Sequence, residues 1–252
     1  MGAPDVLAVI PARYASVRLP GKPLISIAGK PMVQRVWERA SQARRVTRVV
    51  IATDDERIAS AATGFGAQAR MTRADHRSGT DRVAEVASQF PADVYVNVQG
   101  DEPLIEPSAI DAAVDALLEH DSLQVATIAA PVSAPAEIVD PNVVKTVLDF
   151  DGNALYFSRA PIPWVRDFGA RVHARHLKHF GLYVFHRQAL LEFPTLPQGE
   201  LERLERLEQL RWLENGWKVR VAEVACQSIT VDVPEDVARV EALLRQADFG
   251  QA

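Results

Sequence analysis

The run that decides the fold is Val6-Leu7-Ala8-Val9-Ile10, which is followed at once by Pro11-Ala12-Arg13. Short apolar runs rich in β-branched residues are typical of buried strands, and the sequence repeats this pattern with helical patterns in between. Two further apolar runs, at residues 46–52 and 94–98, are predicted strands. Helical patterns lie between the three runs, at residues 32–43, 56–65 and 82–90. Strands that alternate with helices predict βαβ units, and hence a mostly parallel sheet with helices on both faces.

The pattern changes after about residue 140. Strand patterns at residues 143–148 and 154–157 flank the turn residues 149–153, which is the signal of a hairpin rather than of a crossover. Later patterns predict a strand at 177–186 with a bulge or a close approach at Gly181, a helix at 200–215, a strand at 219–224 and a helix at 235–245. We therefore expect one domain over residues 1–252, with an antiparallel annex at about 140–190 of the kind that often carries a dimer contact.

Composition narrows the class of protein. The 252 residues include 28 Lys and Arg against 33 Asp and Glu, a net charge of −5, and 48% are hydrophobic. These values are typical of a globular protein and give no support to a general nucleic-acid binder, which usually carries a basic excess. The single cysteine, Cys226, excludes an internal disulfide framework. Because the sequence shows neither a signal-peptide pattern nor an apolar run of about 20 residues, we expect a cytoplasmic protein.

A basic loop follows the first strand at residues 11–24. It carries Arg13, Arg18 and Lys22 together with Gly21. Ligands of open α/β sheets bind beyond the carboxyl ends of the strands, where cationic side chains and backbone N–H groups can hold phosphates. The loop lacks the glycine pattern of a Walker A motif. The residues alone therefore leave two interpretations open, a phosphate site and a solvated basic loop held by prolines.

Two acidic residues stand at places suited to a metal ion. Asp101 follows the strand at 94–98, and Asp232 lies much later, directly before Val233-Pro234. Carboxylates at the end of a central strand can hold Mg²⁺, which prefers oxygen ligands. Gly100-Asp101 is equally usual in a turn, and an Asp before a helix with Pro in its first turn is a usual N-cap, so the structural alternatives stay open.

A third segment combines Arg77, Ser78 and Thr80 at the start of a predicted helix. Cations and hydroxyls at a helix N-terminus suit a nucleotide contact, although Thr80 as a plain helix cap explains the pattern as well. Glu208 and Gln209 fall inside the helix predicted at residues 200–215, where charged side chains are normally on the solvated face.

Taken together, these segments resemble the 3-deoxy-manno-octulosonate cytidylyltransferase family over nearly the whole chain, from Val6 to Arg245. The motifs that carry the resemblance are Ile10-Pro11-Ala12-Arg13-Tyr14-Ala15-Ser16, Arg18-Leu19-Pro20-Gly21-Lys22-Pro23-Leu24, Ser78-Gly79-Thr80, Val96-Asn97-Val98-Gln99-Gly100-Asp101-Glu102-Pro103, Phe157-Ser158-Arg159-Ala160, Gly181-Leu182-Tyr183, Leu207-Glu208-Gln209-Leu210-Arg211 and Asp232 with Pro234-Glu235-Asp236. One such motif would be weak, whereas this many in the same order are specific. Two positions depart from the family pattern: Thr230 stands where glycine is expected, and the bulky Phe180 follows His179.

The resemblance implies a three-layer, Rossmann-like fold with a mixed, mostly parallel sheet, of the nucleotide-diphospho-sugar transferase type, and a small antiparallel annex for homodimer formation. It implies that the chain transfers CMP from CTP to 3-deoxy-D-manno-octulosonate (Kdo), which gives CMP-Kdo and pyrophosphate for lipopolysaccharide biosynthesis. It also implies dependence on Mg²⁺.

The same resemblance implies roles for individual residues. Those implied for nucleotide binding are Ala12, Arg13, Arg18, Lys22, Arg77, Ser78, Thr80 and Asp101. Those implied for sugar-acid binding are Arg18, Gln99, Arg159, His179, Tyr183, Glu208, Gln209 and Asp232, and the implied metal ligands are Asp101 and Asp232. The reaction is then a direct displacement at the α-phosphorus of CTP by the anomeric hydroxyl of Kdo. Lys22 and Arg18 would offset the charge that grows on the departing pyrophosphate, and Asp101 and Asp232 complete the catalytic set.

Three other functions compete with this one. A cytidylyltransferase for a nine-carbon sialic acid or an 8-amino analogue of Kdo would share the same loops. A metal-dependent glycosyltransferase would release the whole nucleotide diphosphate, and the basic loop after the first strand argues against it. A nucleotide-binding module without activity would not need Lys22, Asp101 and Asp232 together.

Overall fold

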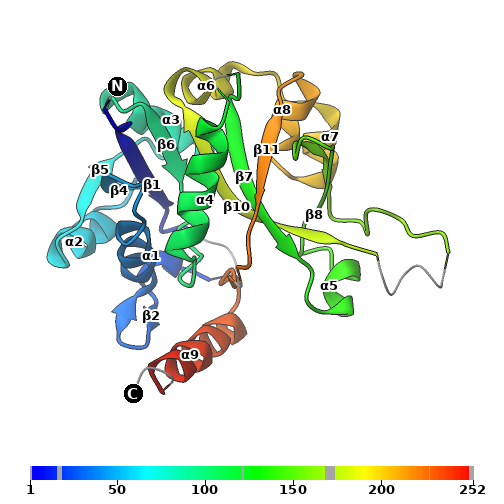
Figure 1. Ribbon diagram of the computed structural model, residues 1–252. Helices are drawn as coiled ribbons and strands as arrows, with labels where there is room; N and C mark the ends of the chain where they lie inside the picture. Colours follow the sequence, from blue (N-terminus) through cyan, green and yellow to red (C-terminus); the bar gives the residue numbers. More distant parts are fainter. Residues whose placement is uncertain (1, 16–18, 121, 168–173, 227, 250–252) are drawn as a thin grey trace.

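The computed structural model of the 252-residue chain describes residues 2–15, 19–120, 122–167, 174–226 and 228–249. In this part of the chain a central sheet has the strand order β11-β7-β10-β6-β1-β4-β5 (Figure 1). These strands are β1 (Val6–Ala12), β4 (Arg48–Thr53), β5 (Gln68–Met71), β6 (Val94–Asn97), β7 (Val125–Pro131), β10 (Leu177–His186) and β11 (Val219–Glu223). The three apolar runs that predicted the fold therefore form neighbouring strands, with β1 between β6 and β4.

All strands on this path except β10 run in the same direction. β1 pairs in parallel with β4 and β6, β4 with β5, and β11 with β7. β10 pairs antiparallel with both β6 and β7, which places it between two strands of the opposite direction. The prediction of a mixed, mostly parallel sheet is confirmed. Because parallel strands end at the same edge of a sheet, the loops that follow β1 and β6 emerge side by side.

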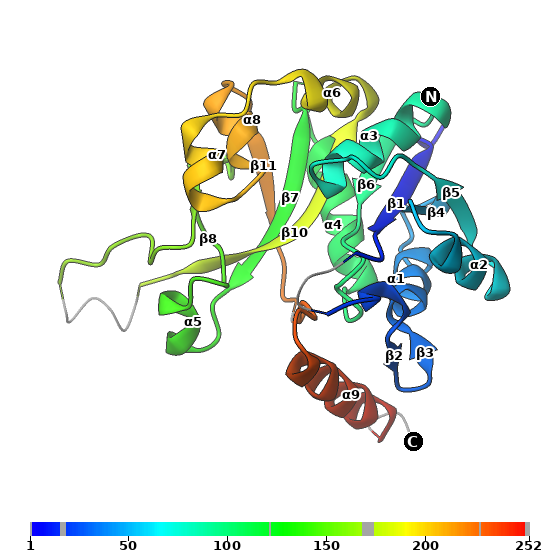
Figure 2. The ribbon, with the colours of Figure 1, turned by 180° about the vertical axis from the view of Figure 1, so that it is seen from behind.

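Helices cover both faces of the sheet, which makes three layers (Figures 1 and 2). Along β1, Val6, Ala8 and Ile10 face one apolar core, and Leu7 and Val9 face the other. The first core is covered by α1 (Met32–Ser41), α2 (Glu56–Gly64) and α4 (Pro107–Leu118), and the second by α3 (Gly79–Gln89), α6 (Arg187–Glu192), the short turn η3 (Phe193–Thr195) and α8 (Leu210–Glu214). None of the described helices is long and apolar enough to cross a membrane.

An antiparallel hairpin extends the sheet beside β10. Its strands, β8 (Lys145–Leu148) and β9 (Ala154–Ser158), pair as the turn residues between them predict, and β8 also pairs with β10. The short helix α5 (Pro135–Val139) precedes the hairpin. The pairing of β10 with β7 shifts in register between Phe180 and Tyr183, which confirms the bulge predicted at Gly181.

The C-terminal helix α9 (Pro234–Phe249) packs against a small hairpin that follows the basic loop (Figure 2). This hairpin consists of β2 (Ser26–Ile27) and β3 (Lys30–Pro31). The contact is an apolar cluster of Ile27, Met32, Val231 and Val240. The cluster holds the segment before α9 close to the loops that follow β1 and β6, although this segment comes more than 100 residues later in the chain.

One predicted helix is wrong. Residues 200–215 form two short helices, α7 (Glu200–Glu205) and α8, because Arg206 takes a left-handed φ of 53° that no α-helix continues. Glu208 and Gln209 lie in the turn between the two helices and not on a solvated helix face, and Gln209 is buried. The break therefore turns these two side chains inward.

Candidate functional site

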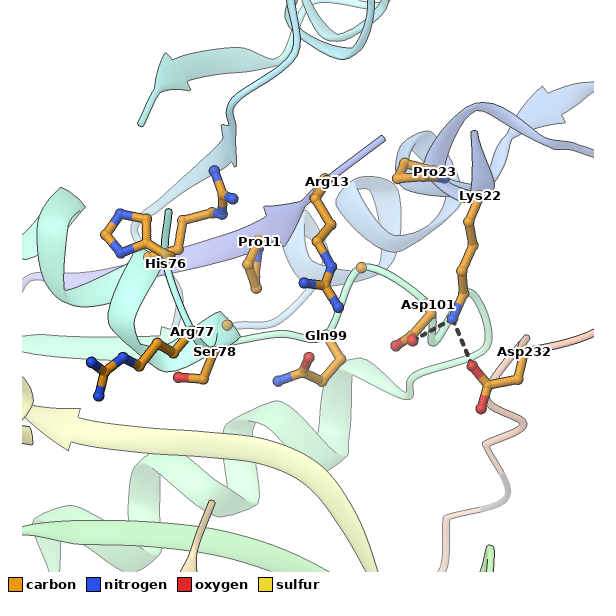
Figure 3. Close-up of a pocket in the computed structure, with 14 residues that line it drawn as sticks. Pro11, Arg13, Lys22, Pro23, His76, Arg77, Ser78, Gln99, Asp101 and Asp232 are labelled. Atoms are coloured by element: carbon orange, nitrogen blue, oxygen red, sulfur yellow. Dashed lines mark hydrogen bonds and ion pairs between the residues drawn. The ribbon is translucent and has the colours of Figure 1, made fainter. Parts of the chain in front are cut away.

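A polar cavity of about 270 Å³ opens at the edge of the sheet where β1 and β6 end (Figure 3). It is lined by Pro11, Ala12, Arg13, Lys22, Pro23, His76, Arg77, Ser78, Gly79, Arg82, Gln99, Gly100, Asp101 and Asp232. These residues come from the basic loop, the start of α3, the loop after β6 and the segment before α9. The cavity therefore joins all three predicted motifs with the distant Asp232.

The basic loop folds back on itself at Gly21. Its N–H donates to the carbonyl of Tyr14 at 3.1 Å, and its φ of 69°, with the Tyr14 ring 3.2 Å from an added Cβ, favours glycine at this position. The guanidinium of Arg57 stacks over the Tyr14 ring, 3.3 Å from its centre. Lys22 then begins the short turn η1 (Lys22–Leu24) with its side chain directed into the cavity (Figure 3). Arg18, also predicted for this site, lies outside the described residues.

The Lys22 ammonium joins the two predicted metal ligands. Its Nζ lies 2.6 Å from Asp101 Oδ2 and 3.0 Å from Asp232 Oδ1 (Figure 3). A backbone hydrogen bond of 2.9 Å from Val231 N–H to the Asp101 carbonyl ties the two segments together. Two carboxylates from distant segments therefore converge on one cation, and the unusual Thr230 before Val231 does not prevent it.

The chemistry of this pair fits a hard divalent cation. Carboxylate oxygens are ligands of Mg²⁺, which is usually held by one or two carboxylates while phosphates and waters fill its other positions. In the described part of the chain no group of three or more His, Cys, Asp or Glu gathers as a metal site, so Asp101 and Asp232 would provide the protein ligands as a pair. Waters or a phosphate-bearing ligand would complete such a site.

Gly100 allows the loop after β6 to pass close to the end of β1. A Cβ on Gly100 would lie 2.7 Å from the Pro11 carbonyl oxygen, closer than real contacts of this kind. Absence of a side chain at this position thus sets how near Asp101 comes to the basic loop. The sequence motif contained this glycine, but only the structure gives its neighbour.

Glu102 is a buried carboxyl next to the cavity that sequence reasoning did not assign. It is 5% exposed, and its Oε2 has no hydrogen-bond partner among the described residues. Burial, followed by the charge of Asp101, raises the pKa of Glu102 to about 7. The raised pKa means that a proton stays on this carboxyl up to a higher pH than on an ordinary glutamate.

The start of α3 presents the nucleotide motif. Ser78 caps the helix: its hydroxyl accepts from the Asp81 N–H at 3.2 Å, while Asp81 Oδ2 accepts from the Ser78 N–H at 3.0 Å. The alternative that Thr80 is the cap is therefore wrong. Arg77 and Ser78 line the cavity, whereas Thr80 is fully buried and donates to Glu208 Oε1 at 2.6 Å.

A network of hydrogen bonds leads from the cavity to the residues predicted for the sugar acid. Gln99 donates to Asn97 Oδ1 at 3.3 Å, and Asn97 donates to Thr80 Oγ1 at 3.1 Å. Thr80 in turn donates to Glu208, whose pKa is raised by burial. Asn97 was given no role because a lone amide in an apolar strand is not a functional signal, although its polarity at the end of that strand was visible in the sequence.

A second network holds the other predicted sugar-acid residues behind Gln99. Tyr183 donates to Gln209 Oε1 at 2.9 Å, and Gln209 Nε2 lies 3.5 Å from His179 Nδ1. Burial lowers the pKa of His179 to about 3 and raises that of Tyr183, so both are neutral near pH 7. Neutral donors and acceptors therefore line this part of the molecule.

Arg159 is a predicted residue that takes part in neither of these two networks. Its guanidinium donates to the carbonyls of Glu205 at 2.7 Å and Pro141 at 2.8 Å, and it does not line the cavity. Its N–H donates to the Glu205 carboxylate at 3.0 Å. These contacts tie the hairpin to the end of α7, and a binding role for Arg159 stays a prediction.

Comparisons with known proteins agree with this geometry. A model of the cytidylyltransferase family matches residues 7–223. The 3-deoxy-manno-octulosonate cytidylyltransferase of Solibacter usitatus is 56% identical over 240 residues, which cover 95% of this chain and 94% of that protein. A solved CMP:2-keto-3-deoxy-manno-octonic acid synthetase complexed with CTP superposes with a TM-score of 0.91 at 46% identity, over 96% of this chain and 99% of that one. The fold is also that of a glucose-1-phosphate thymidylyltransferase from Bacillus anthracis, described as putative, with a TM-score of 0.67 at 14% identity over 95% of both chains.

Proposed function

The chain belongs to the cytidylyltransferase family, and from this premise we infer that it transfers CMP from CTP to Kdo and releases pyrophosphate. The observation that carries the inference is the convergence of Lys22, Asp101 and Asp232 in the cavity at the ends of β1 and β6. These three residues suit the reaction for which the relatives of this chain are named. The product, CMP-Kdo, would serve lipopolysaccharide biosynthesis in the cytoplasm.

On the nucleotide side, we assign Arg13, Lys22, Arg77 and Ser78 to CTP. Their positions around one cavity support this assignment, since three cations there can offset much of the charge of a triphosphate. Ala12 lines the same cavity. The capping of α3 by Ser78 leaves the positive end of the helix directed at the same space, which favours an anion. Arg18 completes the predicted set.

Enzymes of this kind generally use a divalent metal ion, and we propose that it is Mg²⁺ held by Asp101 and Asp232. When bound, it would neutralise phosphate charge and raise the acidity of an oxygen nucleophile. The two carboxylates supply the negative charge that selects a divalent cation, and the Val231–Asp101 backbone hydrogen bond keeps them together. Hard oxygen donors without sulfur or imidazole favour Mg²⁺ over Zn²⁺.

On the sugar side, we assign Gln99, His179, Tyr183, Glu208 and Gln209 to Kdo. Gln99 lines the cavity and connects through Asn97 and Thr80 to Glu208, which supports a continuous polar wall next to the nucleotide. The wall would orient the anomeric hydroxyl of Kdo towards the α-phosphorus of CTP, so that direct displacement follows from proximity. Lys22 would stabilise the charge on the departing pyrophosphate.

We further propose that the chain forms a homodimer through its annex. Four large apolar side chains in and next to the hairpin β8–β9 in the chain are exposed, namely Val139, Phe150, Leu155 and Trp164. Among the described strands, β9 forms a ladder only with β8. Large exposed apolar side chains are typical of association surfaces.

The test is a pyrophosphate-release assay with CTP, Mg²⁺ and a panel of acceptors: Kdo, its 8-amino analogue and a nine-carbon sialic acid. We expect release with Kdo, and loss of turnover by at least about 100-fold in Asp101→Asn and Asp232→Asn. Asp151→Asn, an exposed position in the hairpin turn, is the matched control and should keep wild-type turnover. Release with another acceptor but not Kdo would reassign the substrate, and CTP binding without any product would contradict the proposed transfer.

A further inference from the structure

Thr127 lies behind the residues assigned to the sugar acid and belongs to none of the predicted site motifs. It is fully buried in the middle of β7, otherwise an apolar strand, and pairs in register with Tyr183 of β10. Its Oγ1 lies 2.6 Å from the Leu182 carbonyl oxygen and 2.9 Å from His179 Nε2. The bulge in β10 between Phe180 and Tyr183 brings this carbonyl to the Thr127 hydroxyl.

The direction of each hydrogen bond in this chain of contacts follows from the carbonyl. A carbonyl oxygen can only accept, so the single hydroxyl hydrogen of Thr127 is donated to Leu182, and Thr127 Oγ1 can only accept from His179. The hydrogen of the neutral imidazole is therefore on Nε2, which leaves a lone pair on Nδ1. That lone pair accepts from the Gln209 amide N–H across 3.5 Å, and Gln209 Oε1 accepts from the Tyr183 hydroxyl at 2.9 Å.

We propose that Thr127 is a positioning residue that fixes the tautomer of His179, and through it the orientation of the Gln209 amide. This inference rests on the proposed function, because the donors and acceptors thus ordered are those offered to Kdo. With the direction deduced above, the second amide hydrogen of Gln209 stays available as a donor for the carboxylate or hydroxyls of a sugar acid. The opposite direction would present the amide oxygen instead, and an oxygen repels a carboxylate.

Two substitutions separate this role from simple packing. Thr127→Val keeps the shape of the side chain and removes the hydroxyl, whereas Thr127→Ser keeps the hydroxyl and removes a methyl group. If Thr127 acted by packing alone, the Val variant would resemble the wild type and the Ser variant would be impaired. The proposal requires the reverse order, because only the hydroxyl links Leu182 to His179.

The first measurement needs no substrate. Long-range ¹H–¹⁵N spectra of the chain with ¹⁵N-labelled histidine report the tautomer of each ring, and the signal of His179 is assigned by its absence in His179→Gln. We expect the Nε2–H form in the wild type and in Thr127→Ser, and a shift towards Nδ1–H in Thr127→Val. An Nδ1–H form in the wild type overturns the proposal whether or not the variants fold.

The second measurement is kinetic. We expect Thr127→Val to raise KM for Kdo by about tenfold, the effect of one misdirected hydrogen bond, while KM for CTP changes less than about twofold. Thr127→Ser should keep the wild-type KM for both Kdo and CTP. Equal impairment of the two variants, or a wild-type KM for Kdo in Thr127→Val, overturns the proposal. Because the tautomer is read without Kdo, a failure of the proposed transfer would leave that part of the test intact and distinguishable.

Discussion

Lys22 occupies the place between two carboxylates that a metal ion would also favour. Its ammonium lies within 3.0 Å of both Asp101 and Asp232 and compensates their charge. Two close carboxylates without a cation repel each other, so removal of the ammonium should make the pair a stronger attractor of divalent ions. A side chain assigned to the triphosphate therefore also competes with the metal when no nucleotide is bound.

We expect Lys22→Met to bind Mg²⁺ severalfold more tightly than the wild type in the absence of CTP, and yet to lose turnover by about 100-fold or more. Isothermal titration with Mg²⁺ alone and the pyrophosphate assay measure the two effects. Lys218→Met, an exposed lysine away from the cavity, should change neither. Unchanged or weaker Mg²⁺ binding in Lys22→Met would show that the ammonium does not compete for this place.

Glu102 should make the stability of the metal-free protein depend on pH. Its pKa in the folded chain, about 7, lies above the ordinary 4.5, so folding favours the protonated form. Its contribution to the free energy of unfolding is fully present below about pH 4.5 and is lost as the pH rises through about 7, by about 3 kcal/mol.

In the presence of a metal chelator, Glu102→Gln should therefore be more stable than the wild type at pH 8 and lose this advantage near pH 4.5. Urea unfolding over that range measures it, with the exposed Glu56→Gln as control, and parallel curves for Glu102→Gln and wild type would refute it.

At the scale of elements, the crossing of the β6 loop over the end of β1 depends on Gly100. Gly100→Ala would place a Cβ 2.7 Å from the Pro11 carbonyl, and the loop that carries Asp101 would have to move. We expect a loss of about 1–3 kcal/mol in the free energy of unfolding together with reduced turnover. Gly64→Ala is the matched control, since nothing lies within 4 Å of an added Cβ there and its φ is not left-handed. Urea unfolding and the pyrophosphate assay decide it: wild-type values for Gly100→Ala would mean that the loop tolerates a side chain.

The sequence predicts elements well where the pattern is local. Apolar runs gave the strands around β1, and the turn residues 149–153 gave the hairpin, because burial and turn chemistry are encoded within a few residues. The break at Arg206 has no local signal, since arginine favours helices. It arises from tertiary contacts: the Glu205 carboxylate accepts from the hydroxyl of Ser158 at 2.6 Å and from the N–H of Arg159 at 3.0 Å. The inward placement of Glu208 and Gln209 could not be predicted for the same reason.

At the scale of the whole molecule, the site joins segments that are far apart in the chain. The resemblance to a family predicted that Asp101 and Asp232 meet, but the physical cause, the apolar cluster under α9 and the Val231–Asp101 hydrogen bond, appears only in three dimensions. Thr127 and Asn97 were missed because buried polar residues within strands usually satisfy only the backbone. We propose that residues 1–252 form one domain, since β8 of the annex at about 140–190 pairs with β10 of the central sheet.

The exposed apolar side chains of the annex indicate how the chain associates. Phe150 is fully exposed and Leu155 is 62% exposed, and both belong to the hairpin, whose edge strand β9 forms a ladder only with β8 among the described strands. A stable interface buries about 800 Å² on each partner, and burial of such side chains would supply its apolar centre. We therefore expect about twice the mass of the 27.7 kDa chain in light scattering after size exclusion.

A charge on this edge should separate the copies, because burying an unpaired lysine at an interface costs more than the contact gains. Leu155→Lys is expected to elute with the mass of a single chain at concentrations where the wild type is dimeric. Met71→Lys, which charges an exposed apolar position on β5 at the opposite edge of the sheet, should leave the dimer intact. A wild type that is monomeric at all concentrations would contradict the homodimer, whereas a dimer that survives Leu155→Lys and not Met71→Lys would move the interface from the annex to β5.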